Sequence, residues 1–253
     1  MYRFLLSRKW IAALAVVVVF GVVCVELGLW QLRRLDERKK LNAAISAHMH
    51  LPVVPVGVAL NGADASDALY RRVTATGRYD VSQEVLLTGR ALNDRPGNDV
   101  LTPLVTSDGR GLIVNRGFVS LAIDKPGDPQ TKPPAGEVTV TGILLPSEQR
   151  GFLGQKEPLS GHLASIVRVD VTRIRQQLPY NVFPAYLLLS AQQPAQSGTL
   201  PQLESYIPDL SNGPHLSYAL QWFFFASIGV VAYLVIAWRT ARGKQEVKVS
   251  EPS

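Results

Sequence analysis

The residues of this sequence best suited to chemistry stand at the start of an apolar run near its carboxyl end. The run, Leu216–Trp238, holds 23 residues without Lys, Arg, Asp or Glu, and His215 precedes it. One face of the helix that this run predicts would carry His215, Tyr218, Ala219, Trp222, Ala226 and Gly229. A neutral imidazole nitrogen can bind haem iron while aromatic rings pack on the macrocycle. The same face is also typical of a helix that seats a neighbouring helix on its small residues. Both interpretations stay open at this point.

Two runs are long enough to cross a bilayer. A helix rises about 1.5 Å per residue, and a hydrocarbon core is about 30 Å thick. Leu216–Trp238 meets this requirement, and so does Trp10–Trp30, with 21 residues and Glu26 as its only charge. The first run leads into charged residues without a small-residue cleavage pattern, which favours an anchor over a signal peptide. We therefore predict tails at 1–9 and 239–253, the second of them disordered, and transmembrane helices at 10–30 and 215–238.

The net charge of +6 does not indicate nucleic acid binding. Residues 1–40 hold eight Lys or Arg against three acids, residues 215–253 hold four against two, and the 174 residues between them hold fourteen against fifteen. The excess lies beside the apolar runs, where it attracts lipid headgroups. Cys24 is the only cysteine, which excludes a disulfide framework and a thiolate metal cluster.

The basic residues around the second run predict that both termini are cytoplasmic. Nothing from Gln196 to His215 is Lys or Arg, whereas three basic residues follow within six positions of Trp238. The first run alone argues the opposite, with three basic residues before it and five after. We give more weight to the cleaner asymmetry and expect the central part of the chain outside the cytoplasm.

The residues between the two runs predict a short helix followed by a β-rich domain. Leucines among basic residues at 31–47 are typical of an amphipathic helix at the lipid surface, and we expect this helix to extend the first apolar run. Residues 48–214 form the predicted domain, with a hairpin turn at Ser107–Gly109, a proline-rich loop at 121–136 and a short helix at 171–178. We expect strands at 69–79, 84–88, 100–106, 111–118, 137–145, 165–170 and 185–190. The similar stretches VTATG and VTVTG, at 73–77 and 138–142, suggest related strands in one sheet. The fold class is thus α+β, with two transmembrane helices flanking a mainly antiparallel, barrel-like sheet.

No catalytic constellation is visible, so we expect no enzyme activity. The sequence has no G-x-S-x-G elbow, P-loop, G-x-G-x-x-G or H-E-x-x-H motif. Ser160 and His162 are neighbours without an evident third triad member. His48-Met49-His50 offers ligands that suit copper. The two histidines would share a face on an extended segment and not on a helix, and a solvated stretch is the competing interpretation.

Six stretches together resemble the SURF1 family of cytochrome c oxidase assembly factors. They are LGLWQLRRLDERK at 27–39, RRVTATGRYD at 71–80, VLLTGR at 85–90, VLTPL at 100–104, VNRGFV at 114–119 and HLSYALQWF at 215–223. They run in family order over nearly the whole chain. Phe118 and Ser120 stand where the family commonly has Trp and Pro, and Gly213-Pro214 where many members have asparagines, which concerns the fine shape of the site.

The resemblance implies a two-span protein of a bacterial plasma membrane or a mitochondrial inner membrane that helps to mature the haem-bearing core subunit, subunit I, of an aa3-type oxidase. Because no long transit peptide precedes Trp10, we expect a bacterial member. The resemblance also implies that a second-span histidine, here His215, binds haem a transiently through its iron. From the residues themselves we expect Tyr218 and Trp222 to pack on the macrocycle, and Arg33 or Arg34 to pair with its propionates if the topology places them on the same side of the membrane. Trp30, Gln31, Asn115, Arg116 and Gly117 also match the family pattern. Two alternatives stay open, a haem-independent membrane scaffold for the oxidase and a protein that handles copper.

Overall fold

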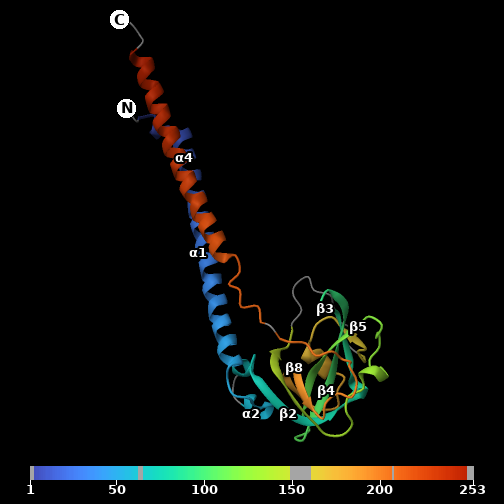
Figure 1. Ribbon diagram of the computed structural model, residues 1–253. Helices are drawn as coiled ribbons and strands as arrows, with labels where there is room; N and C mark the ends of the chain where they lie inside the picture. Colours follow the sequence, from blue (N-terminus) through green and yellow to red (C-terminus); the bar gives the residue numbers. More distant parts are fainter. Residues whose placement is uncertain (1–2, 62–64, 149–160, 207, 250–253) are drawn as a thin grey trace. The chain divides into compact units, whose positions relative to one another are not determined.

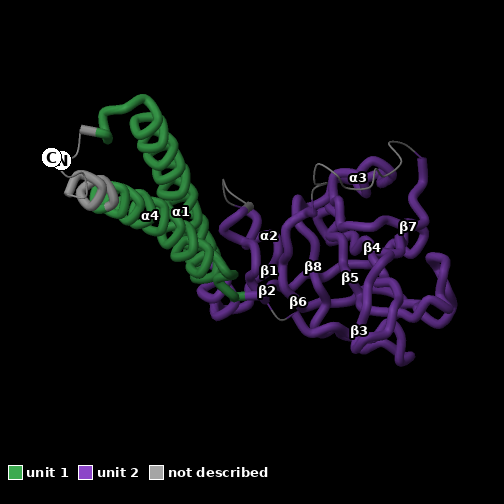
Figure 2. Tube along the Cα trace, turned by 90° about the horizontal axis from the view of Figure 1, so that it is seen from above, with its two compact units in different colours: residues 1–43, 210–253 green, residues 44–209 purple. Residues whose placement is uncertain are grey.

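The structure, a computed structural model, describes residues 3–61, 65–148, 161–206 and 208–249, which fall into two compact units. One unit joins residues 1–43 to residues 210–253, and the other comprises residues 44–209 (Figure 2). Ser160 of the predicted Ser-His pair lies outside the described residues.

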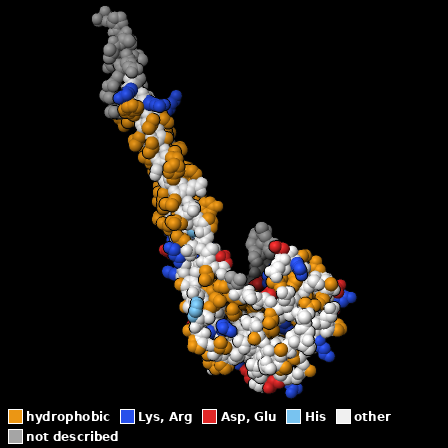
Figure 3. Space-filling view, viewed as in Figure 1, with side chains coloured by type: hydrophobic (Ala, Val, Ile, Leu, Met, Phe, Trp, Pro, Cys, Tyr) orange, Lys and Arg blue, Asp and Glu red, His pale blue; other side chains and the backbone are white. Residues whose placement is uncertain are grey.

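The first unit is a pair of long antiparallel helices. A 3-10 turn at Arg3–Leu6 precedes α1 (Arg8–Met49), and α4 is His215–Val249. The ring of Trp10 meets that of Tyr233 edge to face at 5.7 Å, so the start of α1 lies beside the late part of α4 (Figure 1). Both helices are long and apolar enough to cross a membrane, and most of their apolar side chains are exposed (Figure 3). This arrangement is consistent with a membrane protein of two spans.

The predicted helix at 31–47 extends the first apolar run, because α1 continues without a break from that run to Met49. The sequence has no proline between Arg8 and Met49 to end the helix, and its many leucines and alanines favour helix. The leucines among basic residues at 31–47 therefore mark the part of α1 that follows the apolar run, and not the start of a new helix.

The second unit contains an eight-stranded sheet. The strands are β1 (Val54–Pro55), β2 (Arg72–Tyr79), β3 (Val85–Leu92), β4 (Arg95–Thr106), β5 (Gly111–Ser120), β6 (Val138–Pro146), β7 (Ser165–Ile166) and β8 (Val182–Gln193). Their order is β1-β2-β6-β8-β5-β4-β3-β7, and β2 also pairs with β4. The strands β2, β6, β8, β5 and β4 thereby close a five-stranded barrel. The pairs are antiparallel except β1 with β2, β3 with β7 and β5 with β8. The predicted fold class is confirmed.

The two similar stretches of sequence are direct neighbours in the barrel. Val73 pairs with Gly142, Ala75 with Val140, and Gly77 with Val138 along the antiparallel ladder of β2 and β6. The hairpin between β4 and β5 is also confirmed, since Gly109 turns with φ +78°. Of the predicted strand at 165–170, only Ser165 and Ile166 form a strand, β7. The strand β1 was not predicted, because two residues are too few to show an alternation of apolar and polar side chains.

Short helices and turns complete the second unit. They are α2 (Val56–Ala59), α3 (Val171–Arg175) and 3-10 turns at Ala65–Ala68, Val81–Gln83 and Pro129–Thr131. The side chain of Asp170 caps α3 by accepting a bond from the Arg173 N–H. The predicted loop at 121–136 is confirmed except for the 3-10 turn within it.

The barrel strands bury side chains on both faces. Alternate residues of the five strands, among them Val73, Leu104, Val114, Val140 and Leu187, form one cluster. The residues between them, among them Leu101, Ile113, Ile143 and Leu188, pack with β3, β7 and α3 in a second cluster. A strand sends successive side chains to opposite faces, so the first cluster fills the barrel and the second covers it.

Candidate functional site

The candidate site begins where α4 begins. Gly213 has φ +65°, and Pro214 follows it with a carbonyl that accepts a bond from the Tyr218 N–H at 3.1 Å. A proline at the first turn of a helix has no N–H to leave unsatisfied. His215 is thus held in the first turn of α4, directly after this turn of the backbone.

The imidazole of His215 is oriented by a side chain of α1. Its Nδ1 lies 2.8 Å from Oε1 of Gln31, and the ring is half-buried. An amide oxygen only accepts hydrogen bonds, so with Oε1 as the partner Nδ1 is the donor, and in the neutral imidazole the lone pair is then on Nε2. That tautomer is the one in which Nε2 can bind a metal, with the second ring nitrogen held by the protein. The sequence placed both residues in the family pattern but gave no sign that they touch.

Small residues let α1 and α4 lie close together along the part of the helix pair that follows the bond between His215 and Gln31. A Cβ added to Gly28 would come within 2.5 Å of the Phe223 ring, and one added to Gly229 would lie 3.4 Å from Phe20. Cys24 and Ala219 are fully buried between the helices. Glycine and alanine at such positions let helix backbones approach closely. The stretches at 27–39 and 215–223, on which the resemblance partly rests, therefore pack against each other.

The small-residue face of α4 is accordingly the face that seats α1. Of the two interpretations of this pattern, helix packing is the one that the described contacts bear out for Ala219 and Gly229. The other predicted residues lie around it. Trp222 is half-buried and its ring meets that of Phe225 edge to face at 6.0 Å, while Tyr218 is 48% exposed. A flat ligand on His215 would therefore lie at the side of the helix pair.

Polar side chains of α1 hold the segment that leads into α4. The guanidinium of Arg38 donates to the Ser211 carbonyl at 3.2 Å. The amide of the buried Asn42 donates to the Leu210 carbonyl at 2.7 Å. Together with Gln31 these residues recur along one face of α1. They fix the approach to His215, and sequence reasoning missed both Arg38 and Asn42 in this role.

The predicted propionate partners are on the surface of α1. Arg33 is exposed. Arg34 is exposed as well and pairs with Glu37 at 2.8 Å. They follow Gln31 by two and three residues, so their Cα atoms lie about 3 to 5 Å further along the helix axis. Both are thus within one helical turn of the residue that holds His215.

The His48-Met49-His50 stretch does not present two imidazoles together. His48 and Met49 end α1, and the Nδ1 atoms of the two histidines contact different carbonyls, of Leu69 for His48 and of Ser46 for His50. Among the described residues no group of three or more His, Cys, Asp or Glu side chains could hold a metal ion. Nothing in this geometry favours the copper alternative.

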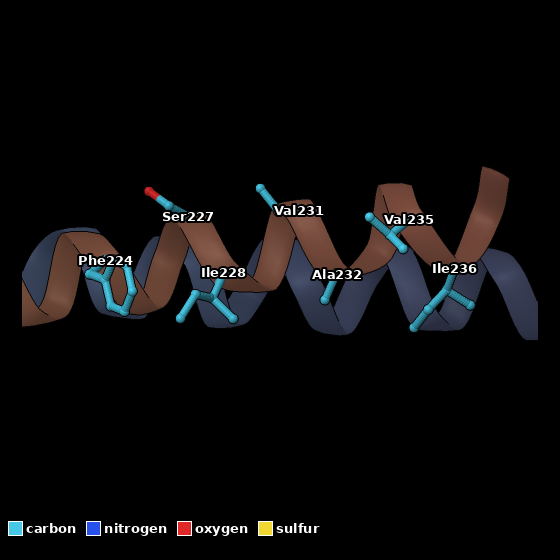
Figure 4. A pocket seen from close by; sticks show the side chains of 7 residues that line it. All are labelled: Phe224, Ser227, Ile228, Val231, Ala232, Val235 and Ile236. Atoms are coloured by element: carbon cyan, nitrogen blue, oxygen red, sulfur yellow. The ribbon is translucent and has the colours of Figure 1, made fainter. Parts of the chain in front are cut away.

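Two hollows lie along the apolar part of the helix pair. One, of about 440 Å³, is lined only by residues of α4, including Phe224, Ile228 and Ile236 (Figure 4). The other, of about 580 Å³, lies between α1 and α4 and has Glu26 among its lining residues. Their linings are almost wholly apolar, and neither includes His215. In a bilayer such surfaces face acyl chains.

The VNRGFV stretch forms a buried polar centre in the barrel unit. Arg116 and Glu84 are each 1% exposed and pair at 3.3 Å. Glu84 also accepts bonds from the Thr102 hydroxyl and the Gly127 N–H, both at 2.8 Å. These hydrogen bonds to Glu84 offset part of the cost of burying the ion pair. Burial lowers the pKa of Arg116, while Tyr79 and Glu84 oppose that shift.

The neighbours of Arg116 are equally constrained. Asn115 donates from its amide to Asp99 at 2.9 Å and accepts a bond from the Gly117 N–H at the same distance. Gly117 has φ +118°, and any Cβ there would collide with the carbonyl of Gln202. Only glycine satisfies both conditions. The three residues match the family pattern for structural reasons that the sequence did not reveal.

A second group of charges surrounds Asp99. Burial raises the pKa of Asp99, while its bond from Asn115 and the nearby Arg90 oppose that shift. The Arg90 guanidinium lies 3.7 Å from Asp99 and 3.5 Å from Glu148. Burial, and then the charge of Asp99, raises the pKa of Glu204 to about 7. The net charge around Asp99 therefore changes near neutral pH, as the Glu204 carboxyl loses its proton.

The fold and the helix seam define a protein with a closed β-barrel unit and two apolar helices consistent with membrane spans. The sequence profile of the SURF1 family matches residues 18–227. Uncharacterized SURF1-like proteins of Mycobacterium tuberculosis and Mycobacterium bovis are each 30% identical over 252 residues, covering 98% of this chain and 91% of theirs. A SURF1-like protein of Rickettsia felis is 26% identical over 230 residues, covering 87% and 94%. The chain belongs to the SURF1 family, as the six stretches predicted.

Proposed function

We propose that this protein is an assembly factor for an aa3-type cytochrome c oxidase that holds haem a transiently on His215 and assists its insertion into subunit I. Family membership supports the role in oxidase assembly. The bond between His215 and Gln31 is the observation that supports haem binding, because it leaves Nε2 as the nitrogen for the iron. Haem a is cargo in this proposal, and the protein performs no catalysis.

The surroundings of His215 suit a cargo that must leave again. Tyr218 is exposed beside the histidine and can cover one part of a macrocycle, while Trp222 lies one turn further along. A single replaceable ligand gives modest affinity, whereas an electron carrier usually fixes both axial positions. Arg33 and Arg34 offer charges for the propionates within a turn of Gln31.

We further propose that the protein lies in a bacterial plasma membrane with both termini in the cytoplasm. The antiparallel pair brings the two ends of the chain to the same side, as the contact of Trp10 with Tyr233 supports. The basic residues after Trp238 then favour a barrel unit outside the cytoplasm. There it would meet the haem-bearing subunit.

The test is the absorption spectrum of the full-length protein purified in detergent from cells that make haem a. We expect a haem a band for the wild type and its loss in His215→Ala. The matched control is His48→Ala with His50→Ala, which should keep the band. A band that survives in His215→Ala would overturn the assignment of the ligand.

A scaffold that supports the oxidase without haem is the second candidate. The observation in its favour is that Ala219 and Gly229 serve helix packing. It predicts that His215→Ala lacks any effect on oxidase maturation, while Gly28→Leu, which wedges the helices apart, blocks it. Measuring haem content of the assembled oxidase in cells with each variant separates the two functions.

A further inference from the structure

The barrel unit contains a pocket that is separate from the helix seam, at the point where two parallel strands diverge. β5 and β8 pair in parallel as far as Asn115 and Leu188. Beyond these residues β8 continues along β6, whereas β5 pairs through Phe118 with Gln202 of the following segment. A pocket of about 220 Å³ fills the gap.

The pocket runs from an exposed mouth to a buried guanidinium. Ser190, Ala191 and Leu203 are exposed at its mouth, while Leu189 and Arg116 are 2% and 1% exposed at its base. Its volume is below the range of about 300 to 1,000 Å³ that drug-sized ligands need. It would hold a small group with an apolar body.

Arg116 is only partly satisfied at this base. Its Nη1 pairs with Glu84 and its Nη2 donates to Oε1 of Gln196 at 3.0 Å. Its Nε is buried and has no hydrogen-bond partner among the described residues. Nε and Nη2 form one edge of the guanidinium, the edge with which arginine binds carboxylates through two parallel bonds. A single amide oxygen now stands where two carboxylate oxygens would fit.

A ligand could take the place of the Gln196 Oε1 atom on Arg116, because the amide nitrogen of Gln196 has a partner of its own elsewhere. Its Nε2 donates to the Lys132 carbonyl at 2.7 Å and its side chain is only half-buried. Gln192 lies beside it, held by a bond from the Tyr79 hydroxyl at 3.0 Å. Small rotations of these two amides would admit an anion to the Nε edge while Glu84 keeps Nη1 in place.

We propose that this pocket binds a carboxylate with a small apolar body, through the Nε and Nη2 edge of Arg116. The carboxylate displaces Oε1 of Gln196, and its apolar part lies against Leu189 and Leu203. The source is either a free short-chain acid or the carboxyl terminus of a polypeptide.

The experiment titrates the full-length protein in detergent at constant ionic strength and follows the Nε–H signals of its arginines by NMR. The probes are sodium butyrate and a pentapeptide ending in leucine, each beside its amide. Saturable binding of butyrate with Kd below about 10 mM identifies a free acid, and binding of the peptide acid alone identifies a polypeptide terminus. Binding of neither acid, or equal binding of the amides, overturns the proposal.

Two substitutions at Gln196 give opposite expectations. Gln196→Ala removes the competing acceptor and should tighten binding by about five-fold, the equivalent of one neutral hydrogen bond. Gln196→Glu places a carboxylate of the protein on the same edge and should weaken binding at least about ten-fold. Gln193→Ala and Gln193→Glu, at an exposed residue outside the pocket, are the matched controls.

A second variant guards against a misfolded Gln196 substitution. Leu203→Trp changes only an exposed side chain at the mouth and should abolish binding by filling the pocket. If the wild type, Gln196→Glu and Leu203→Trp bind the carboxylate probe with equal affinity, the pocket at Arg116 is not its binding site.

Discussion

Nδ1 of His215, at the first residue of α4, lies 2.8 Å from Oε1 of Gln31, in the middle of α1. The two residues are 184 positions apart in the sequence. The bond joins the two apolar helices and at the same time decides which ring nitrogen stays available. Helix association and the orientation of the imidazole are therefore coupled through one contact.

The first prediction concerns this bond. Gln31→Leu removes the acceptor, frees the ring to rotate and permits the wrong tautomer, so we expect the affinity for haem a to fall by about ten-fold or more. The measurement is a titration of the full-length protein with haem a, followed by its absorption band. Gln193→Leu, the same change at an exposed position, should leave the affinity unaltered. Equal affinities for the two variants would show that Gln31 does not position the ligand.

The second prediction concerns the helix seam. A methyl group on Gly28 would meet the Phe223 ring, so Gly28→Ala should lower the free energy of unfolding by about 1 to 3 kcal/mol. Gly21 has no atom within 4 Å of an added Cβ, and Gly21→Ala should be neutral or stabilising by up to about 1 kcal/mol. Thermal unfolding in one detergent compares the two. A double-mutant cycle with Phe223→Ala should give a coupling that offsets much of the Gly28→Ala penalty.

The third prediction concerns the buried ion pair. Glu84→Gln keeps the shape but leaves the Arg116 charge uncompensated, so we expect a loss of about 3 to 5 kcal/mol in unfolding free energy. The control is Glu37→Gln, which removes an exposed partner of Arg34 and should cost no more than about 0.5 kcal/mol. Denaturant unfolding of the full chain measures both. Similar losses for the two would mean that the Arg116 pair contributes no more than a surface pair.

The fourth prediction is a pH dependence of stability that originates at Glu204. Its pKa rises from the ordinary 4.5 to about 7 on folding, so the folded state binds more protons than the unfolded state between these values. This contribution to stability is complete below pH 4.5 and is lost as the pH rises through 7. Because Glu204 is only half-buried, we expect a loss of about 1 kcal/mol.

Glu204→Gln separates this effect from other titrations. The variant should lose the part of the pH dependence between 4.5 and 7 and match the stability of the protonated wild type. Melting temperatures at pH 5, 6, 7 and 8 give the comparison, with Glu137→Gln at an exposed acid as the control. An unchanged slope in Glu204→Gln would place the dependence on another group.

Much of the fold was accessible to sequence because its signals are local. Alternating β-branched residues located all of the barrel strands to within a few residues, and similar stretches marked β2 and β6 as partners. The parallel pairing of β5 with β8 was not predicted. It joins residues about seventy positions apart, and no local period encodes a partner at that distance.

The candidate site was only partly accessible for the same reason. His215 stood out by its place at an apolar run, and the resemblance added Gln31 without a role. The contact between them depends on how two helices pack, which single helix patterns do not specify. Glu84 drew no attention because a glutamate before a strand is usually solvated, whereas here the fold closes over it.

The placement of β8 has a consequence for how the chain matures. It is the last strand in the sequence, yet it lies between β6 and β5 in the closed ring. Until β8 has been synthesised and has crossed the membrane to join the other strands, β5 and β6 each keep an unpaired edge, and such edges invite association with other chains. Only some twenty residues then separate the completed ring from His215. Ring closure and insertion of the second apolar helix are therefore expected to be nearly simultaneous, and a chain that ends before β8 should persist only as a substrate for chaperones and proteases.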